Sequence, residues 1–277
     1  MNYKTSMLSI LTLCIVLASC DTPDTDTTSN LEARLAAYDT LSQEKKTSAA
    51  YATQTFEMAE GTKTTLFAAE PDVINPTNID VDARGRVWVC ESYNYGIPEE
   101  ERTVAGGRIS ILEDTNQDGV ADSRKVFYQG EEVHLALGIA VLGNKVYVTR
   151  SPNMLVFTDD DHDDVPDRID TLFTGMGKPG DHSAHALVFG PDGRFYFNMG
   201  NMGYEVRDRN GDFIVDKAGY EVKSEGKPYI GGMAFRFDQD GDNFEVLGHN
   251  FRNNYELALD SFGTIWQSDN DDDGNQS

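Results

Sequence analysis

The sequence predicts an all-β fold, a β-propeller of four-stranded blades. Four segments share one pattern: an apolar strand, a tight turn with Gly or Asn, and a second strand centred on an aromatic residue. They are residues 78–92, 138–151, 186–200 and 257–270, centred on Trp88, Tyr147, Tyr196 and Trp266. Hairpins of a second type follow the first three, at residues 108–130, 154–175 and 233–249. Four-stranded units repeated along a chain are typical of propeller blades.

The number of blades predicts that the ring is incomplete. Blades one to three have both hairpins, with a long insertion in the third, and the fourth has its first hairpin alone, so about three and a half blades precede Ser277. An open propeller leaves a blade face unburied, and we therefore expect the sequence to be an N-terminal fragment of a longer protein. The alternative is a short chain that assembles with a partner.

Residues 1–19 have the pattern of an export signal. Lys4 precedes an apolar run, which ends in Ala18-Ser19-Cys20. Such a run is too short for a permanent transmembrane helix, and small residues after it are typical of a cleavage site. The cysteine indicates a lipoprotein signal in which Cys20 carries the lipid, whereas an ordinary signal peptide is the alternative. We expect a cell-envelope protein that is lipid-anchored through Cys20, periplasmic or facing the outer membrane.

Three further segments follow the signal. Residues 20–30 are almost all Asp, Thr, Ser and Pro and predict a flexible tether. Residues 31–58 combine spaced leucines with an Ala-rich run and lack Gly and Pro, which predicts a helical lead-in. Residues 59–277 are the partial propeller.

The composition limits the classes of partner. A formal net charge of −24 argues against nucleic acid and favours bound cations. Cys14 leaves with the signal and Cys20 is the lipidation site, so Cys90 remains alone and the mature chain has no intrachain disulfide. The sequence contains no CxxCH motif for haem attachment.

Acidic loops predict calcium sites. Residues 114–122 place oxygen ligands at alternate positions with a glycine for the sharp turn, as in loops that wrap calcium. The spacing recurs in two further loops. The candidate ligands are Asp114, Asn116, Asp118, Asp122, Asp159, Asp161, Asp163, Asp167, Asp208, Asn210, Asp212 and Asp216. The alternative is that Asp, Asn and Gly simply favour turns, and no glutamate stands at the twelfth position of the EF-hand frame.

A different polar set gathers at the other end of the blades. Loops that enter a blade contribute His134, then Asp181, His182 and His185, then Arg252 and Asn253. A histidine beside a carboxylate can be held in one tautomer and accept a proton from an alcohol. Arginine and asparagine suit an anionic or carbonyl-rich ligand. The alternative is that both histidines of the third loop only cap the strand entry, and two histidines are too few to indicate a metal.

Two segments carry a resemblance to a known superfamily. Residues 180–201 (GDHSAHALVFGPDGRFYFNMGN) and 248–274 (GHNFRNNYELALDSFGTIWQSDNDDDG) resemble the glucose/sorbosone dehydrogenase propellers, which use pyrroloquinoline quinone (PQQ). Residues 67–95 (FAAEPDVINPTNIDVDARGRVWVCESYNY) look like the N-terminal propeller of the "membrane-bound dehydrogenase" proteins of planctomycetes and Bacteroidetes. In that family, helical repeats and a CxxCH cytochrome c domain usually follow the propeller.

The resemblance implies roles for individual residues. The histidine of the D-H motif, the general base in the quinone enzymes, matches His182, with Asp181 beside it. The R-N pair that contacts the cofactor matches Arg252 and Asn253, although two extra residues separate this pair from His249. We add His185 and His134 as further candidates for cofactor binding.

Two functions of different classes follow. The first is an exported, lipid-anchored dehydrogenase that oxidises a sugar or alcohol with PQQ and calcium and passes electrons to a cytochrome or to a haem c domain outside this sequence. The second is a non-catalytic, calcium-stabilised propeller that binds carbohydrate or protein. A lactonase-like hydrolase fits less well, because it needs an axial calcium held by carboxylates from several blades. Whether the protein is an enzyme stays open at this point.

Overall fold

The structure, a computed structural model, describes residues 28–53, 56, 58–102 and 104–270. The chain forms two compact units, Met1–Leu66 and Phe67–Ser277. The predicted signal peptide and Cys20 lie outside the described residues. Within the described part of the chain, no helix has the length and apolar character needed to cross a membrane.

The first unit is helical. It contains α1 (Thr28–Asp39), α2 (Gln43–Lys46) and α3 (Ala49–Ala52). The first helix begins at Thr28 rather than at residue 31, inside the segment expected to be a tether. Ser42 caps α2 by accepting a hydrogen bond from the Lys45 amide at 3.4 Å, which satisfies one of the free donors of the first turn.

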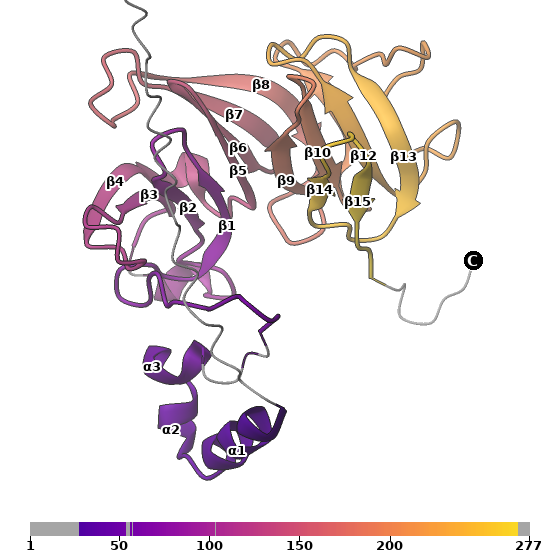
Figure 1. Ribbon diagram of the computed structural model, residues 1–277. Coiled ribbons are helices and arrows are strands. Elements are labelled where there is room, and N and C mark those ends of the chain that lie inside the picture. The colour runs from indigo at the N-terminus through magenta and orange to yellow at the C-terminus, as the bar shows by residue number, and fades with distance from the viewer. Residues whose placement is uncertain (1–27, 54–55, 57, 103, 271–277) are drawn as a thin grey trace, which may run out of the picture. The chain divides into compact units, whose positions relative to one another are not determined.

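The second unit is built from antiparallel sheets, one for each predicted blade, of which the last is a two-stranded hairpin (Figure 1). Blade one has the order β1 (Pro76–Val81), β2 (Val87–Glu91), β3 (Gly107–Glu113) and β4 (Ser123–Gly130). Blade two begins with β5 (Gly138–Leu142), β6 (Lys145–Arg150), β7 (Asn153–Thr158) and β8 (Arg168–Met176). Short 3-10 helices, η2 (Glu99–Glu101) and η3 (Glu131–Val133), lie in the connections.

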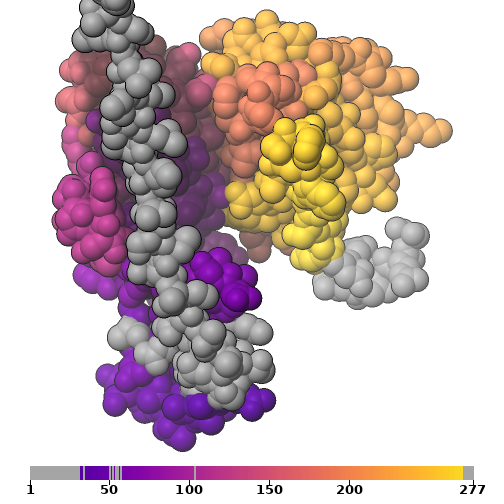
Figure 2. Space-filling view, in the orientation of Figure 1, coloured from indigo at the N-terminus to yellow at the C-terminus, as the bar shows by residue number. Residues whose placement is uncertain are grey.

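Blade three and the last hairpin complete the unit. Blade three is formed by β9 (Ala184–Phe189), β10 (Phe195–Met199), β12 (Gly232–Phe237) and β13 (Glu245–Phe251). The hairpin of β14 (Leu257–Leu259) and β15 (Ile265–Gln267) follows. In Figure 2 this hairpin, in yellow, stands in front of the orange blade three, and Trp266 is 64% exposed. The prediction of an all-β propeller fold of four-stranded blades is confirmed.

The insertion after β10 does not belong to blade three alone. Its first strand, β11 (Tyr204–Asp208), pairs with β8 and extends blade two to five strands. The rest of the insertion folds back on β11 through isolated bridges, such as Arg207 with Phe213. The insertion therefore joins two blades, which the sequence pattern did not indicate.

The blades pack through apolar faces and through side chains that reach the edge of the next inner strand. Phe173, Phe195 and Phe237 lie in the core shared by blades two and three. Between blades one and two, the Asn78 side chain accepts from the Ile139 amide at 2.9 Å and Asp80 from the Val141 amide at 2.6 Å. Backbone donors that an inner strand would otherwise leave unpaired are thus satisfied, and the loops of successive blades meet at the same end.

Candidate active site and acidic loops

His182 lies in the loop of residues 177–183, between β8 and β9, and the turn after β10 holds that loop in place. The Met202 amide donates to the His182 carbonyl and the Gly200 amide to the Ser183 carbonyl, both at 2.9 Å. The Nδ1 atom of His182 lies 3.1 Å from the Asn201 side-chain oxygen. An amide oxygen can only accept, so the ring carries its proton on Nδ1 and Nε2 is the basic atom. No described residue forms a hydrogen bond with Nε2.

Asp181 does not orient the His182 ring, contrary to the predicted histidine–carboxylate pair. Its carboxylate accepts from the Tyr95 hydroxyl at 3.3 Å instead. The negative charge of Asp181 raises the pKa of the Tyr95 phenol, so Tyr95 stays a donor at neutral pH. Tyr95 belongs to the connection between β2 and β3 in blade one. The contact therefore brings blade one to the loop that enters blade three, as expected for loops at one end of a propeller.

Small-molecule sites are clefts of about 300–1,000 Å³, and the loop of His182 borders a cavity of about 530 Å³. Lys178, Asp181 and His182 supply its charged and basic groups. Met202 and Tyr204, each 49% exposed, supply an apolar wall. The cavity thus combines a base, a cation and an aromatic surface.

His185 is a packing residue in the structure, which corrects its expected role in cofactor binding. It lies within β9 and is fully buried. Both ring nitrogens face backbone carbonyls, Nδ1 that of Asn254 and Nε2 that of Asp181, each at 3.0 Å. The ring stacks on Tyr255 with centroids 5.1 Å apart. Burial lowers the pKa of His185, and no atom of its ring is left for a ligand.

His134 is also buried, at the entry to blade two. Its Nδ1 atom has no hydrogen-bond partner among the described residues. Burial, with the nearby Arg102 charge as the next cause, lowers the pKa of this imidazole. Its carbonyl accepts from the Arg150 guanidinium at 3.1 Å. The structure does not bring His134 to the cavity beside His182.

Arg252 and Asn253 lie beside the His182 loop. The Asn201 amide donates to the Arg252 carbonyl at 2.8 Å, so this segment and the orienting residue of His182 are neighbours. The amides of Arg252 and Asn253 both donate to the Asp269 carboxylate, at 2.9 and 2.8 Å. The Asn253 side-chain oxygen is buried without a partner, as are both amide atoms of Asn198. Buried polar atoms of this kind normally meet a water or a ligand.

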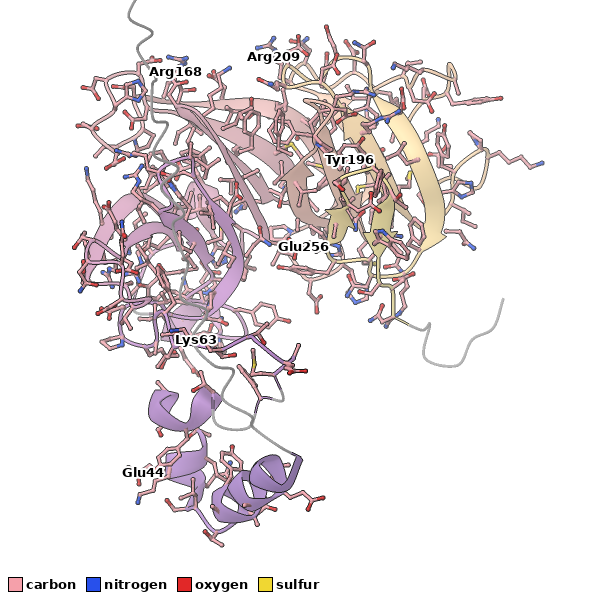
Figure 3. The ribbon with its side chains drawn as sticks, viewed as in Figure 1. Glu44, Lys63, Arg168, Tyr196, Arg209 and Glu256 are labelled. Atoms are coloured by element: carbon pink, nitrogen blue, oxygen red, sulfur yellow. The ribbon has the colours of Figure 1, made fainter. Side chains whose placement is uncertain are left out.

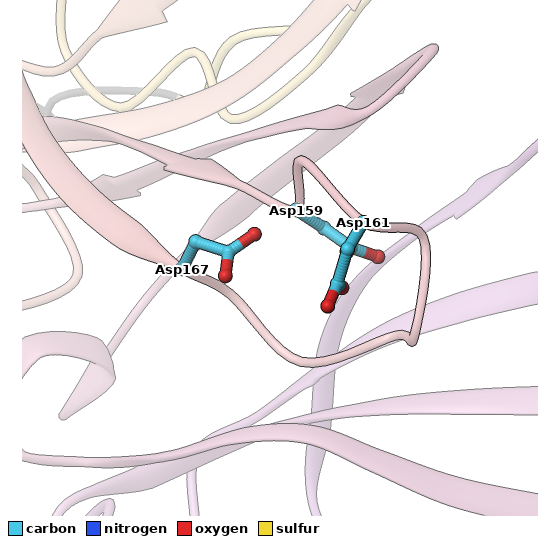
Figure 4. A group of neighbouring side chains, drawn as sticks. All are labelled: Asp159, Asp161 and Asp167. Atoms are coloured by element: carbon cyan, nitrogen blue, oxygen red, sulfur yellow. The ribbon is translucent and has the colours of Figure 1, made fainter.

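The acidic loop between β7 and β8 forms a cluster of carboxylates (Figure 4). Asp159, Asp161 and Asp167 each place one oxygen so that these atoms lie within 4.8 Å of one another. Asp163, the fourth predicted ligand, uses its carboxylate to accept from the Val165 amide at 2.9 Å. The arrangement of three carboxylates around one point is suited to a hard cation.

The other two predicted calcium loops have a different arrangement. Between β3 and β4, the Asp122 carboxylate accepts from the Thr115 hydroxyl at 2.8 Å and the described residues of this loop form no group of three carboxylates. In the third loop, the backbone amide of Asp208 closes a tight turn by donating to the Asp212 carbonyl. Asp216 is buried and accepts from the Tyr229 hydroxyl. The third loop is therefore a hairpin with a buried Asp–Tyr contact, and the expected ligand set of Asp208, Asn210, Asp212 and Asp216 does not assemble.

The fold is a propeller of four-stranded blades, with a cavity bordered by the loop between β8 and β9 and by the turn after β10. The chain belongs to the family whose description is "Domain of unknown function (DUF7133)", with its model matching residues 48–276. No curated protein matches the chain.

Several solved propeller structures are similar at low identity. One is the holo form of the PQQ domain of pyranose dehydrogenase from Coprinopsis cinerea, with 20% identity and a TM-score of 0.48 over 70% of this chain and 43% of that one. A second is the PQQ-bound aldose sugar dehydrogenase of Streptomyces coelicolor, with 17% identity and a TM-score of 0.46 over 71% and 57%. A third, of carbohydrate-active enzyme family AA12 from Trichoderma reesei, has 15% identity and a TM-score of 0.46 over 70% and 45%. The chain thus spans about half the length of each.

Proposed function

We propose that this chain is the propeller of an exported dehydrogenase-like protein that oxidises a sugar or alcohol. The observation that carries the proposal is the His182 ring, held by Asn201 with Nε2 unpaired beside a cavity of about 530 Å³. A substrate hydroxyl that reached Nε2 would transfer its proton there as the C–H bond breaks. Asn201 would accept from Nδ1–H during the reaction and keep the imidazole ring in one orientation.

PQQ fits the residues that surround this cavity. The quinone bears carboxylates and carbonyl groups, which match a cation and amide donors. Lys178 supplies the cation, and the side-chain amide of Asn253, whose segment is bonded to Asn201 through the Arg252 carbonyl, would supply a donor. When bound, PQQ would supply the acceptor for the substrate hydride. Tyr204 and Met202 would contact the apolar face of a sugar ring.

The cellular setting forms part of the same proposal. The signal pattern that ends at Cys20 supports export to the cell envelope and a lipid anchor on that cysteine. Electrons from the reduced quinone would then pass to a cytochrome or a haem c domain, as in the membrane-bound dehydrogenase family that residues 67–95 resemble. Lys178 and Asn253 are the residues of this chain that we assign to holding the quinone.

The Asn201 contact provides a test of the proposal. We expect Asn201→Ala to lower kcat of PQQ-dependent dye reduction on the order of 10²-fold, because misplacing a catalytic group by about 1 Å costs that much. KM is expected to change far less. Asn201→Asp keeps an acceptor for Nδ1–H and should restore most of the rate. Rates are measured on the PQQ-loaded full chain with a panel of aldoses and alcohols. Absence of oxidation with every substrate, despite measured PQQ binding, would contradict the proposal.

We also propose that the cluster of Asp159, Asp161 and Asp167 binds calcium. Its loop is tied to blade one by Asp164, which pairs with Arg86 at 2.9 Å, so a bound ion would rigidify a contact between blades. Calcium at 100 times its dissociation constant is expected to stabilise the protein by about 2.7 kcal/mol. Thermal unfolding with calcium and with a chelator measures this, and Asp161→Asn should abolish the shift. Asp208→Asn is the matched control, and an equal loss of the shift in this variant would refute the assignment to the second loop.

A further inference from the structure

A second cavity lies between blades two and three, at the opposite end of the blades from His182. It has a volume of about 450 Å³ and is bordered by β6, β7 and β8 of blade two, by the end of β11 and by the turn of residues 239–242 in blade three. The β12–β13 turn, like the loop of the Asp159 cluster, connects the third and fourth strands of a blade. The loop of His182 connects two blades and therefore lies at the other end.

Ion pairs occupy the equivalent place between blades one and two. Arg86 is almost fully buried there and binds Asp82 of its own blade at 2.8 Å and Asp164 of blade two at 2.9 Å. Arg84 and Lys125 reach the same Asp164 carboxylate at 3.2 and 3.6 Å. The Asp82 and Asp164 carboxylates of this groove are thus each paired with basic side chains. Ion pairs thus connect blades one and two at this groove.

The equivalent position between blades two and three lacks these ion pairs in the described part of the chain. Trp88 and Tyr147 are equivalent in the repeat, so Lys145 stands where Arg86 stands in blade one. Within the described residues, Lys145 and Arg209 form no ion pair, and the Asp242 carboxylate receives no hydrogen bond, although all three border the cavity. Arg168 and Arg209, which Figure 3 labels, both line it. The cavity therefore offers unpaired donors and acceptors that the neighbouring groove uses internally.

The lining has an apolar base with charges of both signs around it. Tyr147 and Phe173 are buried and form the apolar part, and the Tyr147 hydroxyl is tied to the Gln239 carbonyl at 3.3 Å. Lys145, Arg168 and Arg209 line the cavity together with four aspartates, of which Asp170 is paired with Arg168 at 3.5 Å. An anion would meet the aspartates and a cation would meet the three basic groups. A neutral ligand with many hydroxyls satisfies both, because each hydroxyl donates and accepts.

We propose that this cavity binds a neutral carbohydrate, with its hydroxyls on Lys145, Arg209 and Asp242. The site is separate from the oxidation proposed at His182. It would hold the protein on a glycan while the other end of the propeller acts on a smaller substrate.

The test is direct binding by isothermal titration and saturation-transfer NMR. The probes are four neutral tetrasaccharides (cellotetraose, xylotetraose, maltotetraose and laminaritetraose), with tetragalacturonate as the anionic comparison. At least one neutral probe should bind the full chain, and Lys145→Ala and Arg209→Ala should each weaken it about tenfold or more, the effect of losing a hydrogen bond to a charged group. Arg84→Ala, in the ion-paired groove between blades one and two, is the matched control and should leave the affinity unchanged.

His182→Ala separates the two cavities. Binding that persists in His182→Ala and is lost in Arg209→Ala supports the proposal. Binding that is lost in His182→Ala and retained in Arg209→Ala overturns it, because the sugar then occupies the other cavity. Failure of all four neutral probes to bind, or preference for tetragalacturonate, also overturns it. Dye reduction by Arg209→Ala should equal that of the unmodified chain, so the result does not depend on the oxidation proposal.

Discussion

Replacing His182 by alanine is expected to lower kcat of PQQ-dependent oxidation by about 10²–10⁴-fold, the range that a positioned general base contributes. The expectation rests on the contact of Nδ1 with Asn201 at 3.1 Å, which leaves Nε2 as the basic atom without a donor among the described residues. KM is expected to change less than kcat, because His182 accepts the proton in the transition state and contributes little to binding the substrate in its ground state. Steady-state dye reduction by the PQQ-loaded chain gives both constants.

A second histidine provides the control for this result. His162 lies in the exposed loop between β7 and β8, at the other end of the blades. His162→Ala should retain the full rate, and thermal unfolding of both variants should match that of the unmodified chain within a few degrees. An undiminished rate in His182→Ala would remove the base from the proposed mechanism and favour the reading of this propeller as a non-catalytic binding module.

The strands were predictable because their signal is local. Alternation of apolar and polar residues and the turn glycines are written in short segments, and each of the seven predicted hairpins is present in the structure. The partner of β11 was not predictable in this way. Its pairing with β8 depends on the space beside blade two, and no pattern within residues 204–208 specifies which edge the strand joins.

The candidate site residues also divide into those with a local sequence signal and those whose contacts depend on the assembled fold. His182 was predicted from its motif, whereas its partner Asn201 is 19 residues away and Tyr95 is 86 residues from Asp181. Such contacts exist only after the blades have assembled. His185 was misassigned although a local signal was present: it falls inside an apolar strand, whose first four residues are all buried. The third acidic loop was misread because Asp216 serves a tertiary partner, Tyr229, which the spacing of carboxylates does not reveal.

The largest expected effect on stability concerns Glu91, at the end of β2. Its side chain is fully buried and accepts from the Arg108 guanidinium at 2.8 and 2.5 Å, from the Ser110 hydroxyl at 2.5 Å and from the Ile74 amide at 2.8 Å. Glu91→Ala leaves the Arg108 charge buried without an opposite charge, and removing one member of such a pair costs about 3–5 kcal/mol. Chemical denaturation should therefore show a lower midpoint, while Glu100→Ala, in the exposed 3-10 helix η2, should change little.

The double variant Glu91→Leu/Arg108→Met separates the cost of an unpaired Arg108 charge from the cost of losing the other contacts of Glu91. An apolar pair of similar volume avoids the unpaired charge and should recover part of the stability lost in Glu91→Ala. Recovery should be incomplete, since the Ser110 hydroxyl and the Ile74 amide then lose a buried acceptor. Equal destabilisation of the double and single variants would mean that the cost comes from the neighbours of Glu91 rather than from the Arg108 charge. The double-mutant cycle measures the difference as the coupling free energy of the two residues.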